Sequence, residues 1–190
     1  MPMVTSRKVW TLEELHSLPD DGNKYELVRG ELFVTPPPTD EHETILARLS
    51  MLLGPFVAAN GLGFVYHPRA VLRFQGSEVE PDLMVRQPQP EPGRDWDVAP
   101  IPSLVVEVLS GSTRRRDRQE KKDLYMDAGV AEYWIIDPER RTITVVRPSE
   151  PDRLERERVI WEPVVGSSSL VVLLADVFGR RAILASRLSR

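Results

Sequence analysis

The stretches SLVVEVL at 103–109 and EYWIID at 132–137 decide the fold class of this chain. The first is almost continuously apolar and contains β-branched residues, as expected of a strand that is buried on both faces of a sheet. A charged segment leads from it into a helix that Gly129 is placed to end, and the second stretch then begins another strand. This strand–helix–strand order predicts an α/β fold with a mixed β-sheet flanked by α-helices.

Toward the C-terminus the sheet is expected to continue as a hairpin. The sequence DPER at 137–140 has the composition of a turn, and it leads into RTITVVR at 141–147, which is rich in strand formers. The tail from 150 to 190 predicts one or two further strands and a final helix. Because no internal repeat or low-complexity tract marks a second unit, we expect a single domain over residues 1–190.

Toward the N-terminus the pattern predicts two short strands and then a long helix. KYELVRGELFV at 24–34 is rich in strand formers around a central Arg-Gly turn. Asp40 and Glu43 offer a capping box, after which apolar residues recur at helical spacing as far as an Asn-Gly stop at 60–61. Strand-like runs follow at 63–74 and 82–86.

Composition excludes several classes of protein. The absence of cysteine rules out a disulfide framework, a thiol nucleophile and a thiolate zinc site, and it fits the cytoplasm. The first ten residues lack the apolar core of a signal peptide, and no apolar run is long enough to span a bilayer, so we expect a cytoplasmic protein without a membrane segment. The net charge of −4 argues against a surface that binds nucleic acid throughout, although a local basic patch remains possible.

Glu107 stands inside the most apolar stretch of the chain. Removing a carboxylate from water is costly unless a cation or strong hydrogen-bond donors compensate, so we expect a partner for it. A structural ion pair, or an edge strand that leaves the side chain wet, would explain Glu107 without any function.

Asp82 follows Pro81 at the start of the preceding strand, 25 residues before Glu107. That separation allows a strand, a loop and a neighbouring strand, so the two carboxylates could converge. A Pro-Asp pair by itself is more typical of a turn. Two converging carboxylates would suit a hard divalent cation, which takes oxygen ligands and keeps several waters.

The three histidines show no metal-ligand spacing, and no role is assigned to His16, His42 or His67. We interpret His42 as a capping or surface residue of the long helix. The sequence RRRDRQEKK at 114–122 holds six basic and two acidic residues, and a run of this kind is usually a solvated helix face with internal salt bridges.

Four stretches resemble the Uma2 family, a group of restriction-endonuclease-like proteins within the PD-(D/E)XK nuclease superfamily. They are YELVRGEL at 25–32, EPDLMV at 80–85, PSLVVEVLS at 102–110 and STRRRDRQEKKDLYMDAGVAEYWIIDP at 112–138. The last stretch is long and distinctive, and together the four extend over most of the chain. The resemblance implies a restriction-endonuclease-like α/β core.

By position, the resemblance makes Asp82 the metal-binding aspartate of the superfamily and Glu107 the second acid, with Glu26 as an acid that precedes them. One departure concerns the lysine that usually stands two residues after the second acid, because Leu109 occupies that position. In Uma2-like sequences a lysine of the following helix takes its place. The corresponding residue is Lys121, with its neighbour, Lys122, as the alternative.

The function implied by the resemblance is metal-dependent hydrolysis of phosphodiester bonds in DNA. Asp82 and Glu107 would hold Mg²⁺ or Mn²⁺, and Lys121 would orient the nucleophile. The basic run would then supply sequence-independent phosphate contacts from Arg114, Arg115 and Arg116. A homodimer or a higher homo-oligomer is expected, because two symmetric sites suit the cutting of both strands of a duplex.

Two other functional classes stay open from the sequence. A nuclease-like scaffold that has lost turnover with its standard lysine would bind nucleic acid or a protein partner without cleaving it. A structural or assembly protein would have no evident use for the acidic cluster. The nuclease-like scaffold would bind metal and DNA, whereas the structural or assembly protein would bind neither.

Overall fold

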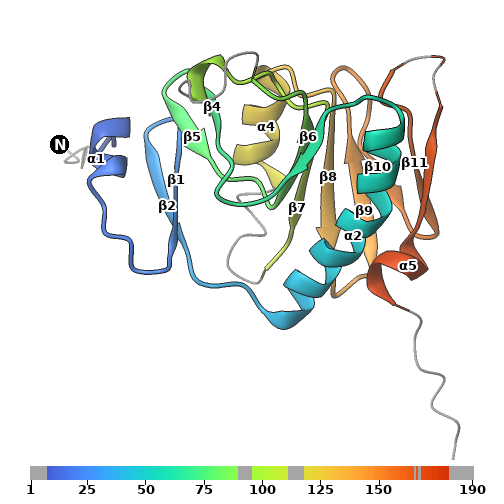
Figure 1. The fold of residues 1–190 in the computed structure, drawn as a ribbon. Helices are drawn as coiled ribbons and strands as arrows, with labels where there is room; N and C mark the ends of the chain where they lie inside the picture. Colours follow the sequence, from blue (N-terminus) through green and yellow to red (C-terminus); the bar gives the residue numbers. More distant parts are fainter. Residues whose placement is uncertain (1–7, 90–95, 111–117, 165, 167, 180–190) are drawn as a thin grey trace, which may run out of the picture.

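The computed structural model describes residues 8–89, 96–110, 118–164, 166 and 168–179. A six-stranded sheet forms the centre of the molecule (Figure 1), in the order β10-β9-β8-β7-β6-β3. Its strands are β3 (Phe64–Tyr66), β6 (Leu83–Arg86), β7 (Leu104–Val108), β8 (Glu132–Asp137), β9 (Thr142–Val146) and β10 (Arg153–Glu155). The β7–β8 pair is parallel and the other pairs are antiparallel, so the sheet is mixed, as predicted.

Two smaller sheets flank the central one. The four-stranded sheet has the order β2-β1-β5-β4 and consists of β1 (Lys24–Val28), β2 (Glu31–Thr35), β4 (Leu72–Phe74) and β5 (Ser77–Val79). Arg29 and Gly30 join β1 to β2 with φ values of 50° and 84°, which is the geometry of a two-residue hairpin turn. The predicted run at 63–74 is divided between two sheets, because β3 joins the central sheet and β4 joins this one.

The helices are α1 (Leu12–His16), α2 (Asp40–Ala59), the 3₁₀ helix η1 (Trp96–Val98), α4 (Glu120–Asp127) and α5 (Leu174–Phe178). The N-cap of α2 is Thr39, whose hydroxyl accepts a hydrogen bond from the His42 N–H. The predicted cap at Asp40 was therefore wrong by one residue, while the stop at Asn60 is confirmed. Within the described ranges, no helix combines the length and apolar character needed to cross a membrane.

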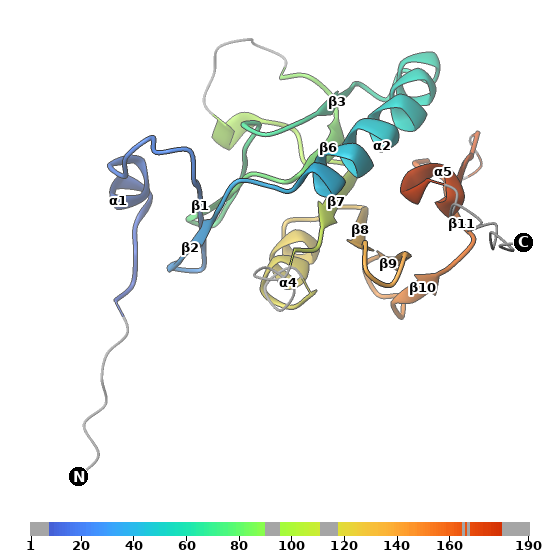
Figure 2. The same cartoon turned by 90° about the horizontal axis from the view of Figure 1, so that it is seen from below.

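The central sheet separates two hydrophobic cores, with α2 on one face and α4 on the other (Figure 2). Alternate residues of one strand enter different cores: Val106 of β7 packs with α2, whereas Val105 packs with α4. Glu107 has the same parity as Val105, so its side chain is directed toward α4. This alternation decides which helix can supply a partner for the buried carboxylate.

The C-terminal part holds more strands than predicted. Besides β10, it contains the hairpin of β11 (Arg158–Trp161) and β12 (Leu170–Leu173), and α5 follows directly. The prediction of one or two strands was too low because RLERERVIW at 153–161 is dominated by charged residues, which hide the strand pattern. Only the alternation of exposed and buried residues in β11 reveals its amphipathic character.

Candidate active site

The register between β6 and β7 sets the two predicted acids side by side. Leu83 pairs with Val106 in the antiparallel ladder. The same register continued by one residue places Asp82 opposite Glu107. Both side chains are buried, and both line the same pocket. The predicted convergence of the two carboxylates is thus present in the fold.

Glu107 is held by two donors from α4. Lys121 Nζ lies 2.6 Å from Glu107 Oε1, and the Tyr125 hydroxyl donates to the same oxygen, also at 2.6 Å. Lys121 and Tyr125 are one helical turn apart, so one face of α4 presents both groups to β7. The expectation that buried Glu107 requires a partner is confirmed.

Glu26 joins this cluster from β1. Its Oε1 lies 2.8 Å from Lys121 Nζ and accepts a hydrogen bond from the Glu80 N–H at 3.0 Å. Lys121 therefore bridges two carboxylates. Lys122, the alternative on the same helix, lies instead with its Nζ 2.7 Å from Asp152 Oδ2. The structure places Lys121, and not Lys122, beside the predicted acids.

Asp82 is surrounded by donors from three other elements. Its Oδ1 accepts a hydrogen bond from Lys24 Nζ of β1 at 3.1 Å. Its Oδ2 accepts one from the Val108 N–H of β7 at 2.9 Å and lies 3.0 Å from His42 Nε2 of α2. Lys24 Nζ also lies 3.9 Å from Glu26 Oε1. Lys24 thus connects Asp82 to Glu26.

Acidic and basic groups alternate along the cluster in the order Asp82, Lys24, Glu26, Lys121, Glu107. Three carboxylates against two ammonium groups leave one formal negative charge before His42 is counted. Each ammonium lies between two carboxylates, which reduces the cost of burying so many charges together.

The pKa shifts follow from these contacts. Burial would raise the pKa of the Asp82 carboxyl, but the Lys24 charge and the His42 hydrogen bond hold it well below its usual value. Burial would lower the pKa of Lys24, but the charges of Glu26, Asp82 and Glu107 raise it above its usual value. For His42 too, burial works against the charged form, and the hydrogen bond to Asp82 overcomes it and raises the pKa. Asp82 is therefore ionised and Lys24 charged at neutral pH.

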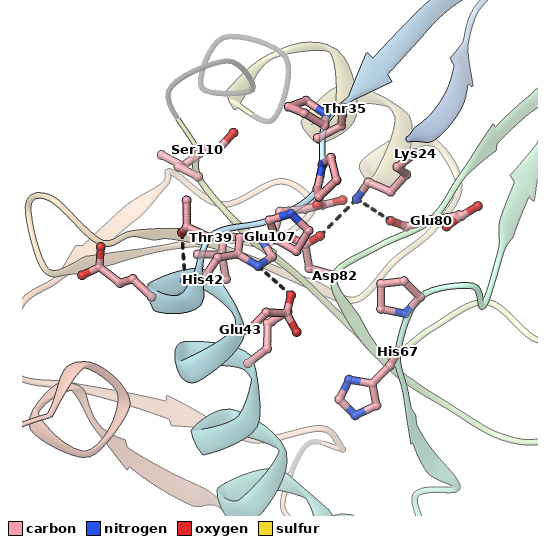
Figure 3. Close-up of a pocket in the computed structure, with 18 of the residues that line it drawn as sticks. Lys24, Thr35, Thr39, His42, Glu43, His67, Glu80, Asp82, Glu107 and Ser110 are labelled. Atoms are coloured by element: carbon pink, nitrogen blue, oxygen red, sulfur yellow. Dashed lines mark hydrogen bonds and ion pairs between the residues drawn. The ribbon is translucent and has the colours of Figure 1, made fainter. Parts of the chain in front are cut away.

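A pocket of about 890 Å³ opens over this cluster (Figure 3). Its walls include the three prolines at 36–38, the first turns of α2, the segment 67–69 and the chain at 107–110 that ends β7. Lys24, His42, Asp82 and Glu107 line it, whereas Glu26 and Lys121 are not among its described lining residues. The polar floor of the pocket is therefore formed by the two ends of the cluster, while its middle, Glu26 and Lys121, lies outside the described lining.

Comparison with known proteins identifies the family and the fold of the chain. The sequence model of Uma2, a family described as "putative restriction endonuclease", matches residues 12–175. The chain belongs to the Uma2 family. A crystal structure described as a putative nuclease belonging to DUF820 from Anabaena variabilis has the same fold, with a TM-score of 0.75 and 22% identity over 89% of this chain and 97% of that chain. No curated protein matches the chain. The predicted family and α/β fold class are confirmed.

Two pocket residues of this Uma2 protein were not predicted. His42 is not a capping or surface residue, because Thr39 caps α2 and the His42 side chain is only 13% exposed. Lys24 stands two residues before Glu26 on one strand, and that spacing was a signal that both side chains share a face. For His42 no such local signal exists, because its partner, Asp82, is 40 residues away. The predicted phosphate contacts at 114–116 lie outside the described residues.

The donor set fits a divalent cation held in part by water. No group of three or more acidic, histidine or cysteine side chains in the described ranges is arranged as a ready metal cage. Mg²⁺ rarely uses such a cage, since it is bound through one or two carboxylates and keeps several waters. Asp82 and Glu107 provide two carboxylates on the wall of one pocket, in a cluster that retains a formal negative charge.

Proposed function

We propose that this Uma2 protein is a metal-dependent endonuclease that hydrolyses phosphodiester bonds in DNA. The observation that carries the proposal is the meeting of Asp82 and Glu107 at one pocket, with a buried lysine between Glu107 and a third acid. Membership of a family described as restriction endonuclease supports the same chemistry. Structural ion pairs alone would not require that two of the carboxylates line an open pocket.

Asp82 and Glu107 would hold Mg²⁺ or Mn²⁺ in this proposal. The bound ion supplies a water of lowered pKa and stabilises charge on the scissile phosphate. Asp82 is suited to the task because its carboxyl stays ionised despite burial. The Val108 N–H donates to Asp82 Oδ2 and fixes the carboxylate against β7. To bind an ion, Asp82 would exchange its contact with His42, which lies on the pocket wall.

Lys121 and Glu26 would hold the two metal-binding acids in position from outside the described lining of the pocket. The Lys121 side chain is 0% exposed, so it acts by placing Glu107 rather than by touching substrate. Glu26 holds the opposite side of the same ammonium and also accepts the Glu80 N–H. Because Glu80 lies two residues before Asp82, this hydrogen bond helps to fix the chain that carries the first acid.

DNA is the proposed substrate, and a homodimer is the proposed assembly. Two copies related by a twofold axis would present one site to each strand of a duplex. Arg114, Arg115 and Arg116 are proposed phosphate contacts. Replacing the three arginines should flatten the dependence of DNA affinity on salt, because each phosphate contact releases counterions.

The experiment that tests the proposal is cleavage of plasmid and single-stranded DNA by the wild type and by Glu107→Ala. Each reaction contains Mg²⁺, Mn²⁺ or a chelator. Metal-dependent cutting that is lost in the variant would support a nuclease that uses this site. Cutting that persists unchanged in Glu107→Ala would overturn the assignment of the site. Asp82→Ala provides the same test for the other carboxylate.

A binding scaffold is the second candidate. The internal pairing of every charge in the cluster favours it, because such a network is stable without metal or substrate. A protein that acts as such a scaffold would bind metal and DNA but would not cut DNA of any sequence, including a randomised library. The library matters because an endonuclease with a strict target would leave a single plasmid intact.

A further inference from the structure

The two lysines of the cluster differ in their access to the pocket. Lys24 lines the pocket and its side chain is 17% exposed, whereas the Lys121 side chain is 0% exposed and lies behind Glu107. Figure 3 shows the Lys24 ammonium directed toward Asp82 and Glu80 on the pocket wall. An ammonium that contacts a substrate must be reachable from the pocket, and only Lys24 meets this condition among the described lysines.

Lys24 also keeps a donor for a ligand. Its ammonium has three N–H groups, and two of them are used by the Glu80 carbonyl oxygen at 3.0 Å and by Asp82 Oδ1 at 3.1 Å. Glu26 Oε1 lies 3.9 Å from the same ammonium, which is too long for a hydrogen bond. A phosphate oxygen in the pocket would therefore find both a charge and a free N–H.

The strand that carries Lys24 places it beside an acid of the cluster. Lys24 and Glu26 are two residues apart on β1, so both side chains emerge on the same face. The two-residue spacing equals that of the usual acid and lysine, which Leu109 breaks on β7, but here the lysine precedes the acid. The chain contains four lysines among 25 basic residues, and two of the four belong to this cluster.

The pocket is lined by many carboxylates, so a phosphate bound there would need a nearby cation. Glu41, Glu43, Glu80 and Glu139 line the walls together with Asp82 and Glu107, so an incoming phosphate meets many carboxylates. The lining cations are Lys24 and Arg69, besides the titratable His42 and His67. The Arg69 side chain is 62% exposed and paired with Asp20 and Glu80, which places it toward solvent. Among the described residues that line the pocket, Lys24 is the fixed cation beside the proposed metal ligand Asp82.

We infer that Lys24 is the lysine that contacts the scissile phosphate of DNA bound in the pocket, and that Lys121 is a positioning residue for Glu26 and Glu107. The inference rests on the proposed nuclease function. Lys24 would neutralise charge that develops on the phosphate oxygens and would hold the phosphate beside Asp82. As a compact point charge with three rotatable donors, an ammonium can serve Asp82 and a phosphate oxygen at the same time.

The test compares Lys24→Met, Lys24→Arg and the matched control Lys122→Met. Affinity for a fluorescent duplex is measured by anisotropy over a salt series, with Ca²⁺ in place of Mg²⁺. Loss of one phosphate contact should reduce the slope of log K against log salt by about 0.9 in Lys24→Met. Lys24→Arg should keep the wild-type slope because the charge remains. Lys122→Met should also keep it, because Lys122 pairs with Asp152 away from the pocket.

Cleavage kinetics with Mg²⁺ give the second readout. Lys24→Met should lower kcat by about 100-fold, the typical effect of removing one donor to a developing oxyanion. Normal DNA affinity, an unchanged salt slope and normal cleavage in Lys24→Met would overturn the inference and leave the nuclease proposal intact. Absence of DNA binding by the wild type would overturn the proposed function and this inference with it. A thermal melt of each variant separates misfolding from loss of the contact.

Discussion

Lys121 Nζ lies 2.6 Å from Glu107 Oε1, and the two side chains are 0% and 2% exposed. The same nitrogen lies 2.8 Å from Glu26 Oε1, so one ammonium compensates two buried carboxylates. When one partner of such a pair is removed, the remaining charge stays in a place that water does not reach. The cluster therefore contributes to the stability of the fold as well as to the proposed chemistry.

Replacing Lys121 by Met should destabilise the protein strongly. The substitution keeps an unbranched side chain that is one atom shorter, but it leaves Glu26 and Glu107 without their shared cation. Breaking a buried pair in this way costs about 3–5 kcal/mol of unfolding free energy. Urea denaturation followed by circular dichroism measures the loss.

Lys122→Met is the matched control, because Lys122 is the next residue of the same helix and its pair with Asp152 is partly exposed. An exposed pair contributes up to about 1 kcal/mol, so this variant should remain close to the wild type. Equal stability of the two variants would contradict the buried role of Lys121.

Replacing Tyr125 by Phe should weaken the hold on Glu107 while keeping the packing of the ring. The Tyr125 hydroxyl donates to Glu107 Oε1, and burial together with the nearby Glu107 charge raises the pKa of Tyr125 well above its usual value. The variant should lose about 1–3 kcal/mol of stability, because the hydrogen bond is made to a charged group. Tyr25→Phe is a control at an exposed hydrogen bond to Asp21. A Tyr125→Phe protein as stable as Tyr25→Phe would argue against this contact.

Asp82 should contribute stability that disappears in acid. Its folded pKa lies below the unfolded value of about 3.9, so the contribution is fully present above that value and is lost as pH falls through the folded pKa. Asp82→Asn should therefore be less stable than the wild type at pH 6, and the difference should shrink as pH falls from about 5 toward 2. Chemical denaturation at a series of pH values provides the measurement. A difference that stays constant over this range would contradict the depressed pKa.

The central features of the fold could be predicted because they are encoded locally. SLVVEVL and EYWIID are strands, as their apolar β-branched character indicates, and the helix between them ends before Gly129 as expected. The number of strands in the C-terminal tail could not be predicted correctly, because β10 and β11 are short and charged. Their pairing depends on neighbours that no local pattern shows.

The acids of the candidate site were more accessible to prediction than their partners. A carboxylate in an apolar strand signals its own need for compensation, and this property singles out Glu107 from the sequence alone. The residues that satisfy Asp82 come from β1 and α2, and tertiary folding alone brings them together. Lys24 gave a weak local signal through its spacing from Glu26. His42 gave none, since a histidine in the first turn of a helix is ordinarily exposed.

His42 should make stability depend on pH near neutrality. Its folded pKa is raised above the ordinary value of 6.5, so the contribution is fully present below that value and is lost as pH rises through the folded pKa. His42→Gln retains a polar group beside Asp82 but cannot become charged. In the presence of a chelator, the wild type should exceed this variant in stability at pH 5.5, and the excess should decline as pH is raised toward 9. His16→Gln is the control, because its partner, Glu78, lies outside the cluster and the His16 side chain is 47% exposed. An excess stability that does not change with pH would mean that His42 stays neutral, and the contact with Asp82 would then be an ordinary hydrogen bond.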